Sequence, residues 1–256
     1  MELAGKVAFI TGASRGIGRA VALAMAADGA DIILNYYLEQ SEAEAVAEDV
    51  RKLGRRVVTV EADVSDHEAL DRAVDRGVAE LGSLDIAVAN AAYSDRELFY
   101  EADLKGFHRT VDVTMWGAFY TLRAAARVMI AQNRGGAIVL VSSPLAEVAM
   151  PRSMAYNMSK AAVDQMARTA AIELVDHRIR VNIVHPGWVD TPGERKFASD
   201  DKLREAAPKL PWKRLAQPEE IARMIAFLCD PKSDYVTGST FRIDGGYTLP
   251  WWLKLL

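Results

Sequence analysis

Tyr156 and Lys160 are the two residues whose types and spacing best suit chemistry in this chain. They lie four positions apart in a stretch typical of a helix, so their side chains leave one face, a turn apart. An ammonium group beside a phenol favours the phenolate, and bringing a phenol pKa of about 10 near neutrality takes about 3–4 kcal/mol. The pair therefore predicts a tyrosine that exchanges protons with a substrate. Pairs of this spacing also occur on surface helices without function, so the rest of the chain decides.

A glycine-rich turn near the N-terminus predicts a phosphate site. The apolar run 6–10 suits a buried parallel strand, and the stretch 19–27 suits a helix. Between them, Gly12, Gly16 and Gly18 permit a tight turn and let backbone N–H groups approach a pyrophosphate, at the positive end of the helix. A glycine cluster alone is more often a plain turn, but its place between a strand and a helix favours a nucleotide-binding loop.

Strands and helices alternate regularly along the whole chain. We expect strands near 6–10, 31–35, 56–61, 84–89, 137–142, 179–185 and 239–243. We expect helices near 16–28, 39–53, 66–81, 107–133, 154–176 and 218–229. This order predicts one α/β domain over residues 1–256. It would be a Rossmann-like, doubly wound parallel sheet of about seven strands, with helices on both faces and ligands at the carboxyl ends of the strands.

The composition excludes several classes of protein. The chain has 256 residues, of which 50% are apolar and 26% charged, as in an ordinary domain with an ample core. A net charge of −4 without a basic stripe argues against a nucleic-acid partner. No apolar run nears the roughly 18 residues of a membrane span. No signal peptide is visible and Cys229 is the only cysteine, so we expect a cytoplasmic protein without an intrachain disulfide.

The four histidines do not form a metal-binding pattern. They are widely spaced, with no pair at i, i+4 and no carboxylate at ligand spacing, so we predict no catalytic metal. They are His67, His108, His177 and His185.

Taken in order, the motifs resemble the short-chain dehydrogenase/reductase family over nearly the whole chain. The matching phrases are Thr11–Gly18, Asp63-Val64, Asn90–Ala92, Ser142-Ser143, Tyr156–Lys160, Pro186–Thr191 and Asp244–Gly246. The resemblance implies one Rossmann-like domain that binds NAD(P) and moves hydride between the cofactor and a small-molecule carbonyl or alcohol substrate.

The resemblance also implies roles for individual residues. Ser143, 13 positions before Tyr156, would hold the substrate oxygen while the Tyr156 phenol moves the proton, with Ser142 as the rival serine. Lys160 would lower the phenol pKa and hold the nicotinamide ribose. With Tyr156 and Lys160, the expected cofactor-binding residues are Gly12, Ser14, Arg15, Gly16, Ile17, Gly18, Tyr36, Asp63, Val64, Asn90, Pro186, Gly187, Val189 and Thr191.

Three of these positions carry specific alternatives. Asp63 resembles the residue that takes the adenine amino group, but a bare aspartate is equally a helix N-cap. Thr191 resembles the residue that bonds the nicotinamide carboxamide, or simply opens a loop. Thr114 stands where the family usually has an asparagine that kinks a helix and anchors a water leading from Lys160 to solvent. We expect Thr114 to be the fourth catalytic residue, although a hydroxyl lacks the two-ended reach of an amide.

Cofactor selectivity rests on residues around the adenosine 2′ position. NAD-preferring members of the family usually carry an acid just after the second strand, and Tyr36 stands there. Arg15 is placed to pair with a 2′-phosphate. Both features favour NADP(H) over NAD(H), although Tyr37 replaces the second arginine of many NADP users.

The substrate side should be the segment of about 188–214 together with 93–100 and 144–154. Within the family the chain most resembles glucose 1-dehydrogenases, through Glu147 and Lys196–Ala198, and an acid near the substrate suits a sugar or polyol. A 3-oxoacyl-[acyl-carrier-protein] reductase is the alternative, although Ile172 replaces an arginine common in those enzymes. A non-catalytic nucleotide-binding protein is a third alternative, which the intact Ser143, Tyr156 and Lys160 oppose.

Two features predict self-association. In the family, the helices expected at 107–133 and 154–176 form a four-helix dimer interface, so we expect a homotetramer (or homodimer). The alternative is an apolar monomer surface. The tail 250–256 carries two adjacent tryptophans, which we expect to dock on a neighbouring subunit or, alternatively, on their own.

Overall fold

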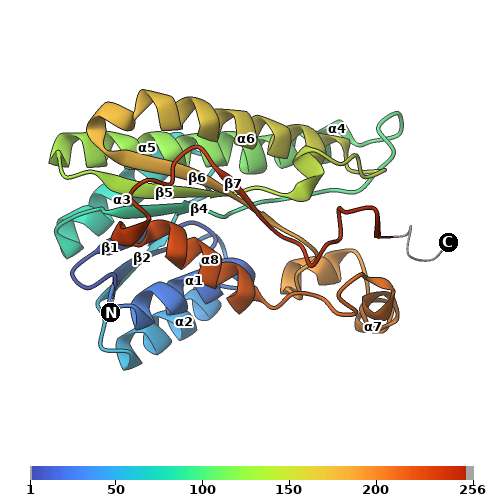
Figure 1. The fold of residues 1–256 in the computed structure, drawn as a ribbon, viewed down its shortest axis with the longest axis horizontal. Coiled ribbons are helices and arrows are strands. Elements are labelled where there is room, and N and C mark those ends of the chain that lie inside the picture. The colour runs from blue at the N-terminus through green and yellow to red at the C-terminus, as the bar shows by residue number, and fades with distance from the viewer. Residues whose placement is uncertain (1, 252–256) are drawn as a thin grey trace.

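Seven parallel strands form one sheet in the order β3-β2-β1-β4-β5-β6-β7 (Figure 1). The computed structural model describes residues 2–251, so most of the tail expected to dock on a neighbour lies outside the described residues. Every predicted strand is confirmed to within two residues. The strands are β1 Val7–Ile10, β2 Asp31–Tyr36, β3 Val57–Glu61, β4 Ile86–Ala89, β5 Gly136–Val141, β6 Ile179–Pro186 and β7 Thr240–Ile243.

Helices cover both faces of the sheet, which confirms the doubly wound architecture. One face carries α1 Gly16–Ala27, α2 Gln40–Lys52 and α8 Pro218–Cys229, drawn below the sheet in Figure 1. The other face carries α3 His67–Leu81, α5 Gly117–Gln132 and α6 Met154–Glu173. Alternate strand residues supply the two cores: Phe9 and Ile33 pack toward α3 and α5, whereas Ile10 and Ile32 pack toward α1 and α8.

The long helix expected over 107–133 is three consecutive pieces. It begins as α4 Leu104–Val111, where the Asp103 carboxylate accepts the Lys105 N–H, and widens into a π-helical turn, η1 Asp112–Trp116, before α5. π-Helical turns inside α-helices often accompany functional sites, and Thr114 lies in this one. The sequence pattern did not reveal this turn.

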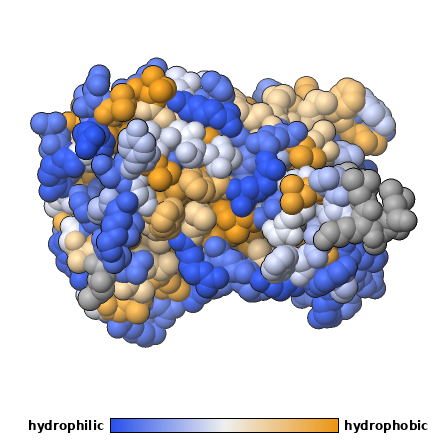
Figure 2. All heavy atoms as spheres, in the orientation of Figure 1, coloured by the Kyte–Doolittle hydropathy of each residue, from blue (hydrophilic) through white to orange (hydrophobic). Residues whose placement is uncertain are grey.

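The substrate segment 188–214 contains a helix that the sequence pattern did not predict. It is α7 Asp200–Ala206, capped by the Ser199 hydroxyl, and it stands apart from both helical layers at the right of Figure 1. In the same orientation, hydrophilic residues (blue) cover much of the face and hydrophobic residues (orange) gather toward its middle (Figure 2). Among residues 2–251, no helix has the length and apolar character that a membrane span requires.

Candidate active site

A cavity of about 1250 Å³ opens at the carboxyl ends of the strands. It brings together most of the residues singled out in the sequence. Those that line it are Gly12, Ser14, Arg15, Gly16, Ile17, Asp63, Val64, Asn90, Ser143, Tyr156, Lys160, Pro186, Gly187, Val189 and Thr191. Gly18, Tyr36 and Thr114 do not line it.

The first turn of α1 faces this cavity without a side-chain cap. Arg15, at the N-cap, makes no capping hydrogen bond, and the first turn contains no acidic residue, so its N–H groups have no side-chain acceptor. Gly12 has φ +62°, and a Cβ there would lie 3.1 Å from the Ala91 Cα. The Asn90 amide fixes this loop by donating to the carbonyls of Thr11 (2.9 Å) and Gly12 (3.2 Å). Free N–H groups at a helix N-terminus fit the phosphates of a dinucleotide.

Gly18 serves the packing of α1 rather than the cavity wall. A Cβ on Gly18 would lie 2.2 Å from the Gly12 carbonyl oxygen, so only glycine lets the helix start this close to its own loop.

Tyr36, at the end of β2, was expected to bind the cofactor but is buried in the core instead. Ile32, Leu34 and Tyr36 point to the same face of the strand because side chains alternate, and all three are buried in the core under α1 and α2. Burial raises the pKa of Tyr36, with smaller contributions from the Glu61 and Glu44 carboxylates. The cavity is lined here instead by Asn35, Tyr37, Leu38 and Glu39.

Arg15 has an acidic partner that the sequence did not reveal. Its guanidinium forms an ion pair of 3.1 Å with Glu39, and half of the Arg15 side chain stays exposed. An acid therefore borders the region where a 2′-phosphate was expected to meet a free arginine.

Asp63 lines the cavity in a network that includes a residue missed by sequence reasoning, Arg109 of α4. Its carboxylate accepts from the Ser65 N–H (3.0 Å) and hydroxyl (2.8 Å) and pairs with Arg109 at 2.8 Å. Burial acts to raise the pKa of Asp63, but the bonds from Ser65 and Arg109 outweigh it and lower the pKa. The helix N-cap alternative is wrong, because Asp66 caps α3.

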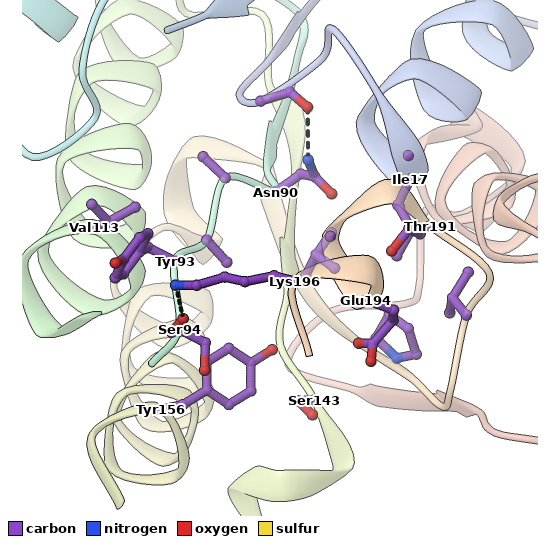
Figure 3. Close-up of a pocket in the computed structure, with 18 of the residues that line it drawn as sticks. Ile17, Asn90, Tyr93, Ser94, Val113, Ser143, Tyr156, Thr191, Glu194 and Lys196 are labelled. Atoms are coloured by element: carbon purple, nitrogen blue, oxygen red, sulfur yellow. Dashed lines mark hydrogen bonds between the residues drawn. The ribbon is translucent and has the colours of Figure 1, made fainter. Parts of the chain in front are cut away.

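Helix α6 presents Tyr156 and Lys160 to the cavity at the end of β5. The Lys160 Nζ donates to the Val141 carbonyl at 2.7 Å, and the Ser142 hydroxyl donates to the Lys160 carbonyl at 3.2 Å. Ser142 is thereby engaged with the backbone of α6. The side chains of Ser143 and Tyr156 both line the cavity, and the Ser143 hydroxyl is close enough to act on the pKa of the Tyr156 phenol (Figure 3).

Burial shifts the pKa of both reacting groups in the direction that disfavours the charged form. Desolvation raises the pKa of Tyr156 to about 12, although the Ser143 hydroxyl acts to lower it. Desolvation lowers the pKa of Lys160 to about 8, and the Asp164 carboxylate partly opposes this. The expectation that Lys160 lowers the phenol pKa stays a prediction, because in this arrangement the ammonium donates to the Val141 carbonyl and desolvation dominates the phenol pKa.

Thr114 is engaged with the loop after β4 rather than with Lys160. Its buried hydroxyl donates to the Tyr93 carbonyl (2.7 Å) and accepts the Tyr93 N–H (3.0 Å). Thr114 does not line the cavity and its hydroxyl hydrogen is already donated, so its side chain holds this loop in place. Its assignment as the fourth catalytic residue stays a prediction.

Two loops meet over the substrate end of the cavity. Lys196 reaches across to the Ser94 carbonyl (2.7 Å) and the Asp95 carboxylate (2.7 Å), as Figure 3 shows for Ser94. Glu194 accepts from the Trp188 indole at 3.0 Å and pairs with Arg96 at 3.5 Å. These contacts bring the segments 93–100 and 188–214 together, and their role as the substrate side stays a prediction.

Glu147, the acid expected near the substrate, lies elsewhere. It forms an ion pair with Arg242 of β7 and does not line the cavity. Its nearest neighbours include the buried imidazole of His185, whose Nδ1 is 4.0 Å from the Glu147 carboxylate. The position of Glu147 therefore gives no structural support for a sugar substrate.

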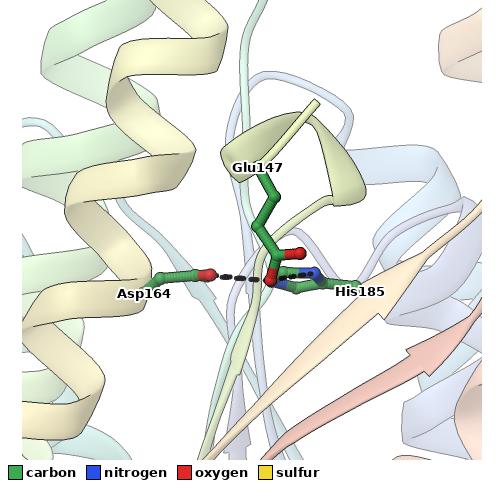
Figure 4. A group of neighbouring side chains, drawn as sticks. All are labelled: Glu147, Asp164 and His185. Carbon is green, nitrogen blue, oxygen red and sulfur yellow. Dashed lines mark hydrogen bonds and ion pairs between the residues drawn. The ribbon is translucent and has the colours of Figure 1, made fainter. Parts of the chain in front are cut away.

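Glu147, Asp164 and His185 form the one candidate metal cluster found among residues 2–251 (Figure 4). His185 Nε2 lies 2.9 and 3.0 Å from the two Asp164 oxygens, which suits an imidazole N–H donating to a carboxylate. Arg242 already pairs with Glu147, and Arg168 lies 3.5 Å from Asp164. Since these positive charges oppose a cation, the geometry indicates a network joining α6 to β6. The absence of a catalytic metal stays a prediction.

The chain is similar to known proteins over nearly its whole length, including the residues that line the cavity. A family model described as enoyl-(acyl carrier protein) reductase matches residues 12–248, which include every phrase of the cavity wall. Glucose 1-dehydrogenase 2 of Bacillus subtilis (strain 168) is 32% identical over 249 residues, covering 97% of this chain and 96% of the relative. Cis-4-hydroxycyclohexanecarboxylate dehydrogenase of Sinomonas cyclohexanicum is 38% identical over 244 residues, covering 95% and 96%.

Solved structures agree in fold over nearly the whole length. A short-chain type dehydrogenase/reductase from Mycobacterium marinum superposes with a TM-score of 0.90 at 37% identity, covering 97% of both chains. Carveol dehydrogenase from Mycobacterium avium, in complex with NAD, superposes with a TM-score of 0.89 at 34% identity, covering 97% of this chain and 99% of that chain.

Proposed function

Because this chain belongs to the short-chain dehydrogenase/reductase family, and is an NAD(P)-dependent oxidoreductase acting on alcohols, we propose that its catalytic residues are Ser143, Tyr156 and Lys160. The observation that carries this proposal is that Ser143, Tyr156 and Lys160 line the same cavity, with Lys160 one turn along α6 from Tyr156. When bound, the nicotinamide supplies or accepts the hydride.

In this proposal each side chain at the reacting centre has its own role. Ser143 holds the oxygen of the substrate, and the Tyr156 phenol gives that oxygen its proton in reduction or receives it in oxidation. Lys160 supplies the positive charge that stabilises the phenolate once its ammonium leaves the Val141 carbonyl for the ribose hydroxyls. Thr191 lies against the glycine loop, since a Cβ on Gly16 would be 3.4 Å from its methyl group. In this proposal its side chain bonds the carboxamide of the nicotinamide.

In this proposal the dinucleotide lies along the residues that line the same cavity. The uncapped N–H groups of α1 hold the phosphates, with Gly12, Ser14, Gly16 and Ile17 around them. Asp63 and Val64 receive the adenine, and Asn90, Pro186, Gly187 and Val189 border the middle of the cavity.

We propose NADP(H) as the favoured cofactor over NAD(H). The half-exposed Arg15 guanidinium, at the edge lined by Tyr37 and Leu38, supports this. Glu39 opposes it, because its carboxylate already pairs with Arg15 and repels a 2′-phosphate. We therefore expect a modest preference that depends on salt, and equilibrium titration with both cofactors tests it.

For the substrate, we propose a secondary alcohol or the matching ketone, with sugars and polyols as the first group to test. One relative is named for glucose and another for a hydroxycyclohexanecarboxylate, and both are secondary alcohols or their hemiacetal equivalents. A 3-oxoacyl-[acyl-carrier-protein] reductase is the second candidate, which the family model's description favours. The exposed, uncharged Ile172 on α6 weakens it, because an acidic carrier protein needs a basic surface.

A panel of sugars, polyols, ketones and 3-oxoacyl thioesters, followed by the absorbance of reduced nicotinamide, tests the activity. Turnover that disappears in Tyr156→Phe supports it. A protein that binds the dinucleotide but turns over nothing in the panel would be the non-catalytic alternative.

We also propose a homotetramer or homodimer. Exposed apolar residues on the outer face of α5 and α6 support it, namely Phe119, Ile130, Met154, Met158 and Ile172. Sedimentation velocity tests the oligomeric state. Cytoplasmic location stays a prediction from the sequence.

A further inference from the structure

Arg96 presents its guanidinium to the substrate end of the cavity, with one long ion pair to Glu194. It lines the cavity beside Tyr93, Ser94 and Glu194. Within residues 2–251 its one ionic contact is the 3.5 Å pair from Nη2 to Glu194, whose same oxygen already accepts the Trp188 indole N–H at 3.0 Å. A guanidinium has five N–H donors in a fixed fork, so most of the fork is left for a ligand.

The guanidinium is also held in place before any ligand arrives. Its central carbon lies 3.8 Å from the centre of the Phe197 ring, a cation–π contact that restrains the guanidinium. An arginine that is already oriented loses less conformational freedom when it binds an anion, because less side-chain motion remains to be frozen.

Arg96 is paired less closely than its neighbour Lys196, at 3.5 Å from Glu194 against 2.7 Å from Lys196 to Asp95. Lys196 is already bonded to the Ser94 carbonyl and the Asp95 carboxylate. The rest of this end of the cavity is largely aromatic and aliphatic, with Tyr93, Leu145, Met150, Trp188 and Phe197. Such a wall suits the carbon skeleton of a small alicyclic or aliphatic molecule.

We infer that the substrate is an alcohol or ketone that also carries a carboxylate, and that Arg96 binds this carboxylate while Ser143 and Tyr156 hold the reacting oxygen. This inference rests on the proposed oxidoreductase activity and adds the chemical class of its substrate. A carboxylate matches a single guanidinium fork with two parallel hydrogen bonds. A phosphate dianion would need a second cation, and Lys196 is engaged elsewhere.

The test compares three substrates that share one ring. They are a cyclohexanol bearing a ring carboxylate, its methyl ester, and unsubstituted cyclohexanol, each oxidised by the full-length protein with saturating NADP⁺ or NAD⁺. A charge-assisted bidentate contact should make kcat/KM about 10- to 100-fold higher for the carboxylate than for the ester. In Arg96→Gln this advantage should disappear through a rise in KM, while the ester keeps its kcat/KM within about twofold. Arg72→Gln, an exposed arginine on α3, is the matched control.

Equal kcat/KM for acid and ester, or an equal loss for both in Arg96→Gln, would overturn the inference and leave the oxidoreductase intact. The proposed function fails differently, through no turnover of any alcohol. Calorimetric binding of cyclohexanecarboxylate, lost in Arg96→Gln, reports the anion site independently of turnover. Absence of that binding in the native protein would also overturn the inference.

Discussion

The Lys160 ammonium nitrogen lies 5.4 Å from the centre of the Tyr156 ring, yet it donates its hydrogen bond to the Val141 carbonyl. Both groups are desolvated, so the pKa of the phenol is raised and that of the ammonium is lowered. Spacing along α6 therefore brings the two groups together without making them an ion pair. The electrostatic coupling needed for catalysis depends on moving the ammonium away from Val141.

Tyr156→Phe should abolish proton transfer while sparing the cofactor site. General acid–base catalysis by a positioned side chain contributes about 10²–10⁴-fold, so kcat should fall by at least that range. The dissociation constant for the dinucleotide should change by less than about twofold, because the ring remains. Steady-state kinetics and fluorescence titration measure the two effects. An equal loss of cofactor affinity would mean that the phenol acts in binding instead of chemistry.

Lys160→Met should change how stability depends on pH. The folded-state pKa, about 8, lies below the ordinary value of 10.5, so the unfolded chain binds more protons between these pH values. The contribution of Lys160 to the free energy of unfolding therefore rises with pH across that window. Below pH 8, burial of the cation lowers this free energy by about 3 kcal/mol. Losing the bond to Val141 costs about 1–3 kcal/mol, so the variant should be nearly as stable as the native protein at pH 7.

Urea unfolding at pH 7 and pH 9.5 measures this effect. The native protein should gain about 2 kcal/mol over Lys160→Met between the two pH values. Lys52→Met, at an exposed position of α2, controls for loss of a surface charge. Parallel pH dependences in the native protein and Lys160→Met would show that the buried ammonium does not titrate in this window.

The sequence predicted the elements well because each strand is a buried apolar run between turn signals. It also placed the cavity, since the motifs come at the ends of consecutive strands that the fold must align. It could not predict that the Tyr36 side chain points into the core. Side chains alternate along a strand, so an error of one residue in its register places a side chain on the opposite face of the sheet. The partners of Thr114, Arg96 and Asp63 lie 21, 98 and 46 residues away, and no local pattern records such contacts.

Arg15→Ala and Glu39→Gln should move cofactor preference in opposite directions. Removing Arg15 should weaken NADP(H) binding by about 3- to 10-fold with little effect on NAD(H), since the pair is half exposed and partly screened. Glu39→Gln frees the guanidinium and removes a repulsive carboxylate, so NADP(H) should bind about 2- to 5-fold more tightly. Arg19→Ala, which breaks a comparable surface pair with Asp49, is the control. Parallel changes for both cofactors would place the 2′-phosphate away from Arg15.

Thr114→Val should loosen the loop after β4. The substitution keeps the shape but leaves the Tyr93 N–H and carbonyl without their partner, at a cost of about 1–3 kcal/mol in the free energy of unfolding. Thr114→Ser keeps the hydroxyl and should lose less than half as much. If Thr114 only positions the loop, the pH profile of kcat should be the same in all three proteins. A shifted profile would restore a catalytic role to its hydroxyl.

Asp164→Asn tests whether the network under α6 sets the protonation of Lys160. Asp164 lies one turn after Lys160 and acts to raise its pKa, so removing the charge should lower that pKa further below about 8. The amide oxygen can still accept from His185, which limits disruption of the contact between α6 and β6. Activity that requires the ammonium should then be lost at lower pH than in the native protein.

The pH profile of kcat/KM separates this effect from a merely structural one. Lost packing alone should lower the whole profile without moving it, whereas a lost charge moves its alkaline limb. Glu173→Asn, on the same helix and exposed, controls for a general change of charge. His185→Asn should destabilise the fold without moving the limb in the same direction, because Asp164 keeps its charge beside Arg168. An alkaline limb that stays in place in Asp164→Asn would mean that Lys160 is tuned by burial alone.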